Sequence, residues 1–186
     1  MRFYRLSTAA IVMLLSMLNT PAHELLENRA TLVLRDNNHI TATLYISYPE
    51  ALYRTLAPNL TYQEFLVQYA ALSPTDSQKL LLQAQQEWQS TIKLRSSTST
   101  ELTPVQWQWP AAEQVQNSIR ETVIQAMVNV QPHIEPLDIH TEFTQKQAIK
   151  SISIEFPKAF DRVMVVTYKP TQRWVETGKK SAAISF

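Results

Sequence analysis

The chain contains no cysteine and a single glycine among its 186 residues. Without cysteine it can form no disulfide, no thiolate metal site and no cysteine nucleophile. With one glycine it cannot build the glycine-rich loops that hold phosphates in nucleotide-binding folds. The G-x-S-x-G and H-E-x-x-H signatures are missing as well, and His133-Ile134-Glu135 lacks the cysteine pair of a zinc deaminase. These absences predict a protein that is not an enzyme.

A strong excess of charge is also lacking. The formal net charge is +1, and hydrophobic residues make up 45% of the chain against 18% charged residues, which is a globular composition. Arg2 and Arg5 lie in the first 22 residues, which hold no acid, so the remainder carries 15 basic and 16 acidic residues. This balance lacks the basic footprint of a nucleic-acid-binding protein, and we expect no nucleic-acid partner.

Residues 1–22 have the pattern of a secretory signal peptide. Arg2 and Arg5 are followed by an apolar run of 13 residues from Leu6 to Leu18, and Thr20 and Ala22 are the small residues expected before a cleavage site. The run is too short for a membrane-spanning helix, which needs about 20 apolar residues. We therefore expect a periplasmic protein without a membrane span, with residues 23–186 forming a single domain.

The region from Ala30 to Tyr48 contains two alternating apolar runs around a polar turn, the pattern of a β-hairpin. A two-residue loop would mix apolar and polar residues on one face, whereas a three-residue loop at Asp36-Asn37-Asn38 pairs Leu34 with Ile40. Such a loop needs a left-handed backbone, which asparagine tolerates. The resulting apolar face consists of Leu32, Leu34, Ile40, Ala42, Leu44 and Ile46.

A helical block of about 40 residues is predicted after the hairpin. Pro49 opens a helix that extends to Ala57. Thr61 with Glu64 has the spacing of a capping box, and Ser73 repeats the start signal for a helix to about Gln89.

The remaining chain is mostly strand by its period-two pattern. Strands are expected at 91–95, 105–109, 137–143, 149–156, 163–168, 173–176 and 182–186. Residues 111–129 fit a helix that starts after Pro110, although 122–130 also fits a strand, and we prefer the helix. The element order predicts an α+β fold, an antiparallel sheet or sandwich with the helical block inserted after the hairpin.

His23 carries the one specific chemical prediction. Cleavage after Ala22 would give this residue both a free α-amine and an imidazole, which together can chelate copper, with a second histidine completing a nitrogen-rich site. His133 and His140 are the candidates for that second ligand. His39 ranks last because it lies at the tip of the hairpin, far from the end where His23 begins.

Trp107 and Trp109 share one face of a predicted strand. Such a pair can form a stacking platform for a sugar or a peptide, but paired aromatic residues at period two more often fill a core. We therefore expect core packing here.

The two ends of the chain resemble small exported bacterial domains of unknown function, similar to the periplasmic parts of HupE/UreJ-like nickel or metal permeases. The features concerned are the signal peptide that ends before His23, the hairpin with the helical block, and the segment Tyr168 to Val175 before a turn at Gly178. The resemblance implies metal handling, with only His23 carried over, and an envelope protein or membrane permease as partner.

Two functions remain open at this point. The first is a periplasmic binding or accessory protein that handles copper through His23. The alternative is a structural or protein-interaction module of a cell-envelope assembly, without a small ligand. The alternative predicts an exposed sheet edge or apolar patch.

Overall fold

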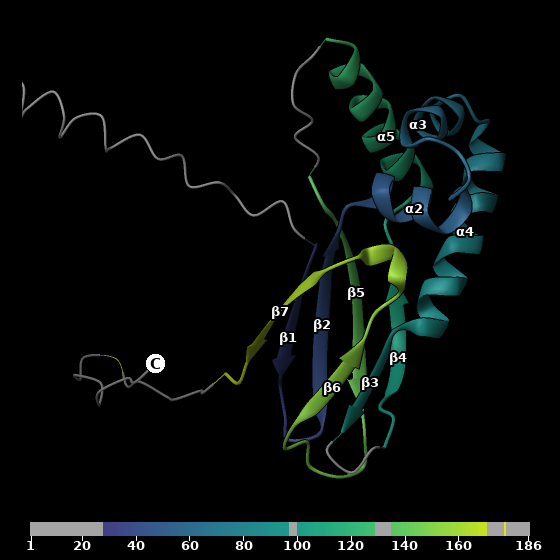
Figure 1. Ribbon diagram of the computed structural model, residues 1–186. Coiled ribbons are helices and arrows are strands. Elements are labelled where there is room, and N and C mark those ends of the chain that lie inside the picture. The colour runs from purple at the N-terminus through teal and green to yellow at the C-terminus, as the bar shows by residue number, and fades with distance from the viewer. Residues whose placement is uncertain (1–27, 97–99, 129–134, 171–176, 178–186) are drawn as a thin grey trace, which may run out of the picture.

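The computed structural model describes residues 28–96, 100–128, 135–170 and 177. They form a five-stranded sheet of order β4-β5-β2-β1-β7, a two-stranded sheet β3-β6, and helices gathered at one end of the large sheet (Figure 1). This architecture confirms the predicted α+β class. The described strands are β1 (Asn28–Leu34), β2 (His39–Ile46), β3 (Lys93–Ser96), β4 (Thr103–Gln108), β5 (Leu137–Thr144), β6 (Ile152–Glu155) and β7 (Val163–Tyr168).

The hairpin has the predicted register, with Leu34 opposite Ile40 and a loop at residues 36–38. The expectation of a left-handed backbone in this loop is wrong, because none of residues 36–38 has a positive φ. In the described part of the chain, Asp161 is the one non-glycine residue with a positive φ (54°). The connection between β5 and β6 binds the loop instead. There the backbone N–H groups of Gln145 and Ile149 donate to the carbonyls of Asn38 and Asn37.

The helices begin where the capping signals predicted. Thr61 and Glu64 form the expected capping box, and Ser73 accepts a hydrogen bond from the Asp76 backbone N–H at 3.1 Å. The helix preferred in the region 111–129 is confirmed and extends over Ala112–Met127, and the Ala111 backbone N–H donates to the Gln114 side chain at 3.0 Å. The helices are α2 (Tyr48–Leu56), α3 (Tyr62–Ala70), α4 (Pro74–Thr91), α5 (Ala112–Met127) and the short 3-10 helix η1 (Lys158–Phe160).

Strand β7 differs from the expected antiparallel pattern, because it runs parallel to β1 while the other strand pairs are antiparallel. Segment η1 was not predicted, and β6 is shorter than the predicted strand at 149–156. The predicted strands at 173–176 and 182–186 lie outside the described residues.

One continuous core joins the inner face of the large sheet to the helices. Trp88 on α4 is fully buried, and its ring lies edge-on to Tyr48 and Phe160 at centroid distances of 5.5 and 5.2 Å. Its Nε1 donates to Thr55 Oγ1 at 2.8 Å, so its polar atom is satisfied inside the core. A search of the described helices finds none with the length and apolar character to cross a bilayer.

Candidate functional site

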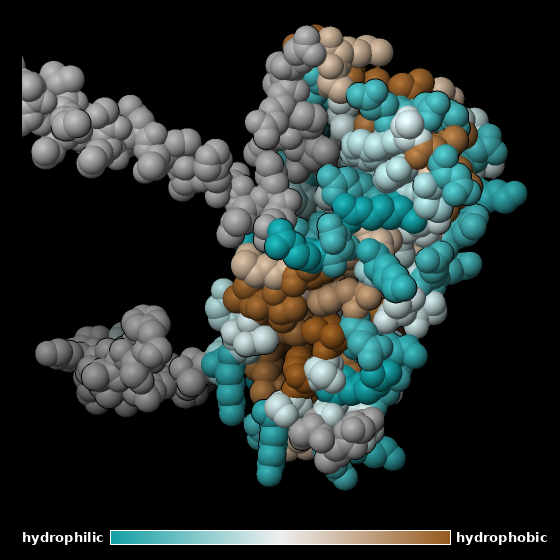
Figure 2. Space-filling model, in the orientation of Figure 1, coloured by the Kyte–Doolittle hydropathy of each residue, from teal (hydrophilic) through white to brown (hydrophobic). Residues whose placement is uncertain are grey.

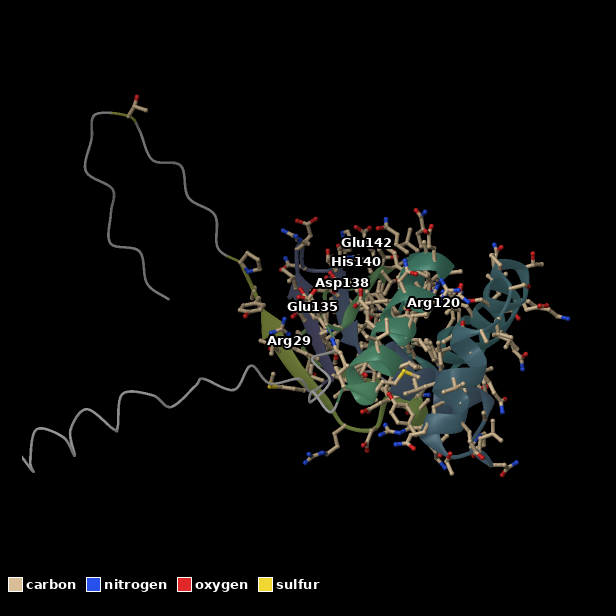
Figure 3. The ribbon with its side chains drawn as sticks, turned by 90° about the horizontal axis from the view of Figure 1, so that it is seen from above. Arg29, Arg120, Glu135, Asp138, His140 and Glu142 are labelled. Atoms are coloured by element: carbon tan, nitrogen blue, oxygen red, sulfur yellow. The ribbon has the colours of Figure 1, made fainter. Side chains whose placement is uncertain are left out.

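Of the three histidines predicted to bind metal, the structure describes His140 alone. His23 and His133 lie outside the described residues, and copper binding stays a prediction. His140 lies on the exposed outer face of β5, between Asp138 and Glu142 in the row of side chains labelled in Figure 3.

The surroundings of His140 are polar and open. Its Nδ1 lies 3.2 Å from Thr43 Oγ1, and its Nε2 lies 3.8 Å from a carboxylate oxygen of Asp138. Both His140 and Asp138 are nearly half exposed. His140 can therefore be reached by a ligand from solvent, with one carboxylate beside it.

His39 cannot share an ion with His140. His140 pairs with Thr43, which lies four residues from His39 along β2. Four residues of strand correspond to about 13 Å, far beyond the span of one coordination sphere. The His39 ring lies beside Glu142 instead, with Nε2 3.3 Å from the carboxylate. Within the part of the chain that the structure describes, no group of three or more such side chains could hold a metal.

The paired tryptophans extend the core. Their rings stack at a centroid distance of 5.3 Å, Trp107 lies edge-on to Phe143, and Trp109 contacts Trp88. Both pack against buried residues and are only partly exposed. This arrangement agrees with the expected core packing.

A polar pocket of about 520 Å³ lies between α5 and the start of β5. Glu121 and Glu135 line it together with amide and hydroxyl side chains of α5. Neither carboxylate makes a hydrogen bond or an ion pair with a described residue.

The free edge of β7 is the most unusual surface of the fold. In the described sheet β7 has a neighbour on one side only, the parallel strand β1. Its six residues include four apolar residues and a tyrosine but no charge and no proline. Met164, Val165 and Tyr168 are 36%, 41% and 56% exposed. An unprotected apolar edge of this kind is a template for pairing with another chain.

The opposite edge of the same sheet is protected. Strand β4 contains Pro104, which cannot donate to a ladder, and its register shifts between Pro104 and Trp107. Proline and an irregular register are devices by which edge strands avoid pairing with other chains. Of the two edges of the five-stranded sheet in the described residues, β7 is therefore the one without these protective features.

An apolar groove lies beside this edge, between β7 and the segment that leads into β6. Leu32, Leu34 and Ile40 of the sheet's inner face line it, together with residues 149–152 and 167–169. Its volume is about 520 Å³. Figure 2 shows this area as a brown surface between β7 and β6, bordered by hydrophilic side chains. We call this surface, with the free edge of β7, the β7 groove.

The sequence predicted β7 as a strand but did not indicate that it lies at an edge of the sheet. A continuous apolar run is typical of a strand buried on both faces. Here such a run lies at an edge of the sheet, and Met164 and Val165 within it are exposed. The run of Val163 to Val166 was the available signal, but the edge position depends on the long-range pairing with β1.

Comparison with known proteins adds no assignment. No family model, no curated protein and no solved structure matches this chain.

Proposed function

We propose that this chain is a non-enzymatic protein-interaction module that binds an extended segment of another protein along the β7 groove. The unprotected apolar edge of β7 carries the proposal. A peptide that adds a strand to such an edge gains main-chain hydrogen bonds, and pockets beside the edge select its side chains.

The groove supplies both parts of this binding mode. The edge of β7 offers backbone groups on its unpaired side, and Leu34 and Ile40 offer an apolar surface for alternate side chains of an added strand. The basic residues Lys150 and Lys169 at the rim favour a partner segment with acidic residues.

The predicted cleavage before His23 would place the module in the periplasm. An envelope protein is the class of partner that this compartment supplies, and the resemblance to the periplasmic parts of HupE/UreJ-like permeases makes a membrane permease one candidate.

A neutral strand-forming peptide tests the binding mode. The peptide acetyl-Ser-Thr-Val-Thr-Val-Thr-Val-Ser-amide should shift the backbone amide NMR signals of Val163 to Tyr168 and leave those of β4 unchanged. The absence of any shift in β7 at millimolar peptide would contradict strand addition.

Two N-methylated peptides separate edge pairing from unspecific apolar contact. Alternate residues of a strand direct their N–H groups to opposite edges, so methylation of one alternate set should abolish binding while methylation of the other set preserves it. Equal binding by both methylated peptides would count against pairing with β7.

A further inference from the structure

The β7 groove has a charged end. Lys169 follows the end of β7 at Tyr168, and Lys150 lies just before the start of β6. Both line the groove. Both lysines are exposed, and neither makes an ion pair with a described residue. The lining of the groove contains no carboxylate, so the charge of the lining residues is positive alone.

The start of β7, outside the residues that line the groove, carries both signs of charge, including the exposed Arg162. Arg54 Nη2 lies 3.4 Å from a carboxylate oxygen of Asp161, just before β7. Arg95 pairs with Glu155 at the end of β6. Among the residues that line the groove, Lys150 and Lys169 are therefore the only charged ones.

The direction of an added strand decides which of its ends lies beside the two lysines. Antiparallel pairing is slightly more stable per residue than parallel pairing. A strand that runs antiparallel to β7 begins where β7 ends, beside Lys150 and Lys169. We propose, resting on the strand addition proposed above, that the partner segment runs antiparallel to β7 and carries aspartate or glutamate at its amino-terminal end.

A second copy of this chain fits the edge poorly. In a β7–β7 pair that aligns all six residues, Val163 lies opposite Tyr168 of the second copy. The flanking Arg162 then lies opposite Lys169 of the second copy, and this like-charge contact occurs at both ends of the pair. Like charges directly opposite one another destabilise a strand pair.

Two peptides of identical composition test the polarity. The first is acetyl-Asp-Glu-Thr-Val-Thr-Val-Thr-Val-amide, and the second, acetyl-Thr-Val-Thr-Val-Thr-Val-Glu-Asp-amide, carries the same acids at the other end. We expect the first to bind the full chain about tenfold more tightly at low ionic strength, with the difference largely lost at about 1 M salt.

Charge reversal supplies the matched control. Lys169→Glu or Lys150→Glu should remove the preference for the first peptide, while Lys79→Glu on α4, with the same change of charge, should keep it. Equal affinities of the two peptides would overturn the inference but leave strand addition standing. Tighter binding of the second peptide would also overturn it, because the partner would then run parallel to β7.

The remaining outcomes identify other occupants. If neither peptide binds, the proposed strand addition along the β7 groove is itself contradicted. Binding that appears only after residues 171–186 are deleted would assign the groove to the chain's own tail and overturn the inference. Concentration-dependent dimerisation in sedimentation experiments, abolished by Val165→Lys, would assign it to a second copy and overturn the inference as well.

Discussion

The side chain of Asn28 is joined to the backbone of Phe160, a residue 132 positions later in the chain. Asn28 Nδ2 donates to the Phe160 carbonyl at 2.6 Å, and Asn28 Oδ1 accepts from the Ser47 backbone N–H at 2.8 Å. One buried amide thus connects the start of β1, the junction of β2 with α2, and the turn before β7.

Replacing Asn28 should therefore destabilise the whole fold. Asn28→Ala removes both hydrogen bonds and leaves a carbonyl and an N–H group without these partners. We expect a loss of about 2–4 kcal/mol in the free energy of unfolding, measured by urea denaturation. Asn117→Ala, an exposed position on α5, should stay within about 0.5 kcal/mol of the wild type. Similar losses in the two variants would contradict the structural role of Asn28.

Two tyrosines on α2 provide a matched pair with opposite expectations. The Tyr48 hydroxyl is buried without a hydrogen-bond partner in the described structure, whereas the Tyr53 hydroxyl donates to the Leu60 carbonyl at 2.9 Å. Tyr48→Phe should leave the free energy of unfolding unchanged or raise it by up to about 1 kcal/mol, and Tyr53→Phe should lower it by about 1 kcal/mol. Thermal and urea unfolding of both variants measure the difference. A larger loss from Tyr48→Phe than from Tyr53→Phe would show that the Tyr48 hydroxyl has a partner.

The Tyr48 hydroxyl should also make the free energy of unfolding depend on pH in the alkaline range. Burial raises the pKa of Tyr48 well above its ordinary value of 10.0. The unfolded chain releases this proton near pH 10 while the folded chain retains it, so folding loses stability as the pH rises above about 10. Tyr48→Phe should reduce this loss, which urea titrations at pH 9 and 11 would measure. An unchanged alkaline loss in the variant would assign it to other groups.

The hairpin and the helices could be predicted because their signals are local. Alternation sets the pairing of Leu34 with Ile40, since a one-residue slip would expose the apolar face. The caps at Thr61 and Ser73 fix where α3 and α4 begin. These features depend on residues a few positions apart.

The features that were missed depend on distant segments. The parallel pairing of β1 with β7 joins residues such as Ala30 and Val165, and no nearby residue encodes it. The conformation of the hairpin loop depends on hydrogen bonds from Gln145 and Ile149. The β7 groove follows from the same long-range pairing, so the sequence of β7 indicated a strand but not its place at the edge of the sheet.

The capping box of α3 should contribute an acid-dependent part of the stability. Glu64 accepts hydrogen bonds from the Thr61 hydroxyl at 2.7 Å and from the Thr61 backbone N–H at 2.9 Å. These bonds lower the pKa of Glu64 below its ordinary value of 4.5. The contribution is therefore present above the unfolded-state pKa and is lost as the pH falls through the folded value.

Carboxyl NMR titration measures this shift directly. Thr61→Ala should return the pKa of Glu64 toward 4.5, because it removes the hydroxyl donor. Glu64→Gln keeps an acceptor for the backbone N–H but removes the titrating group, so it should flatten the acid dependence of unfolding. A Glu64 pKa at or above its ordinary value in the wild type would show that the box does not form in solution.

Copper binding should depend on the position of the α-amine as well as on the His23 imidazole. Chelation through one residue requires both groups, so a mature chain that begins at His23 is expected to bind Cu(II) in isothermal titration. His23→Ala removes the imidazole, and one alanine added before His23 moves the amine. Either change should weaken binding sharply, while His39→Ala should have no effect.

Alanine substitutions can also show which histidine is the second copper ligand. If His140 completes the site, His140→Ala should lower the Cu(II) affinity and His133→Ala should not, and the opposite result would select His133. Asp138→Asn retains the His140 ring and removes the adjacent charge, so it distinguishes a ligand from a nearby carboxylate.

Mass mapping of the exported protein must find His23 at its amino terminus. Undiminished affinity after His23→Ala, or no binding tighter than about 1 µM, would rule out this site, since an imidazole and an amine together should hold Cu(II) more tightly.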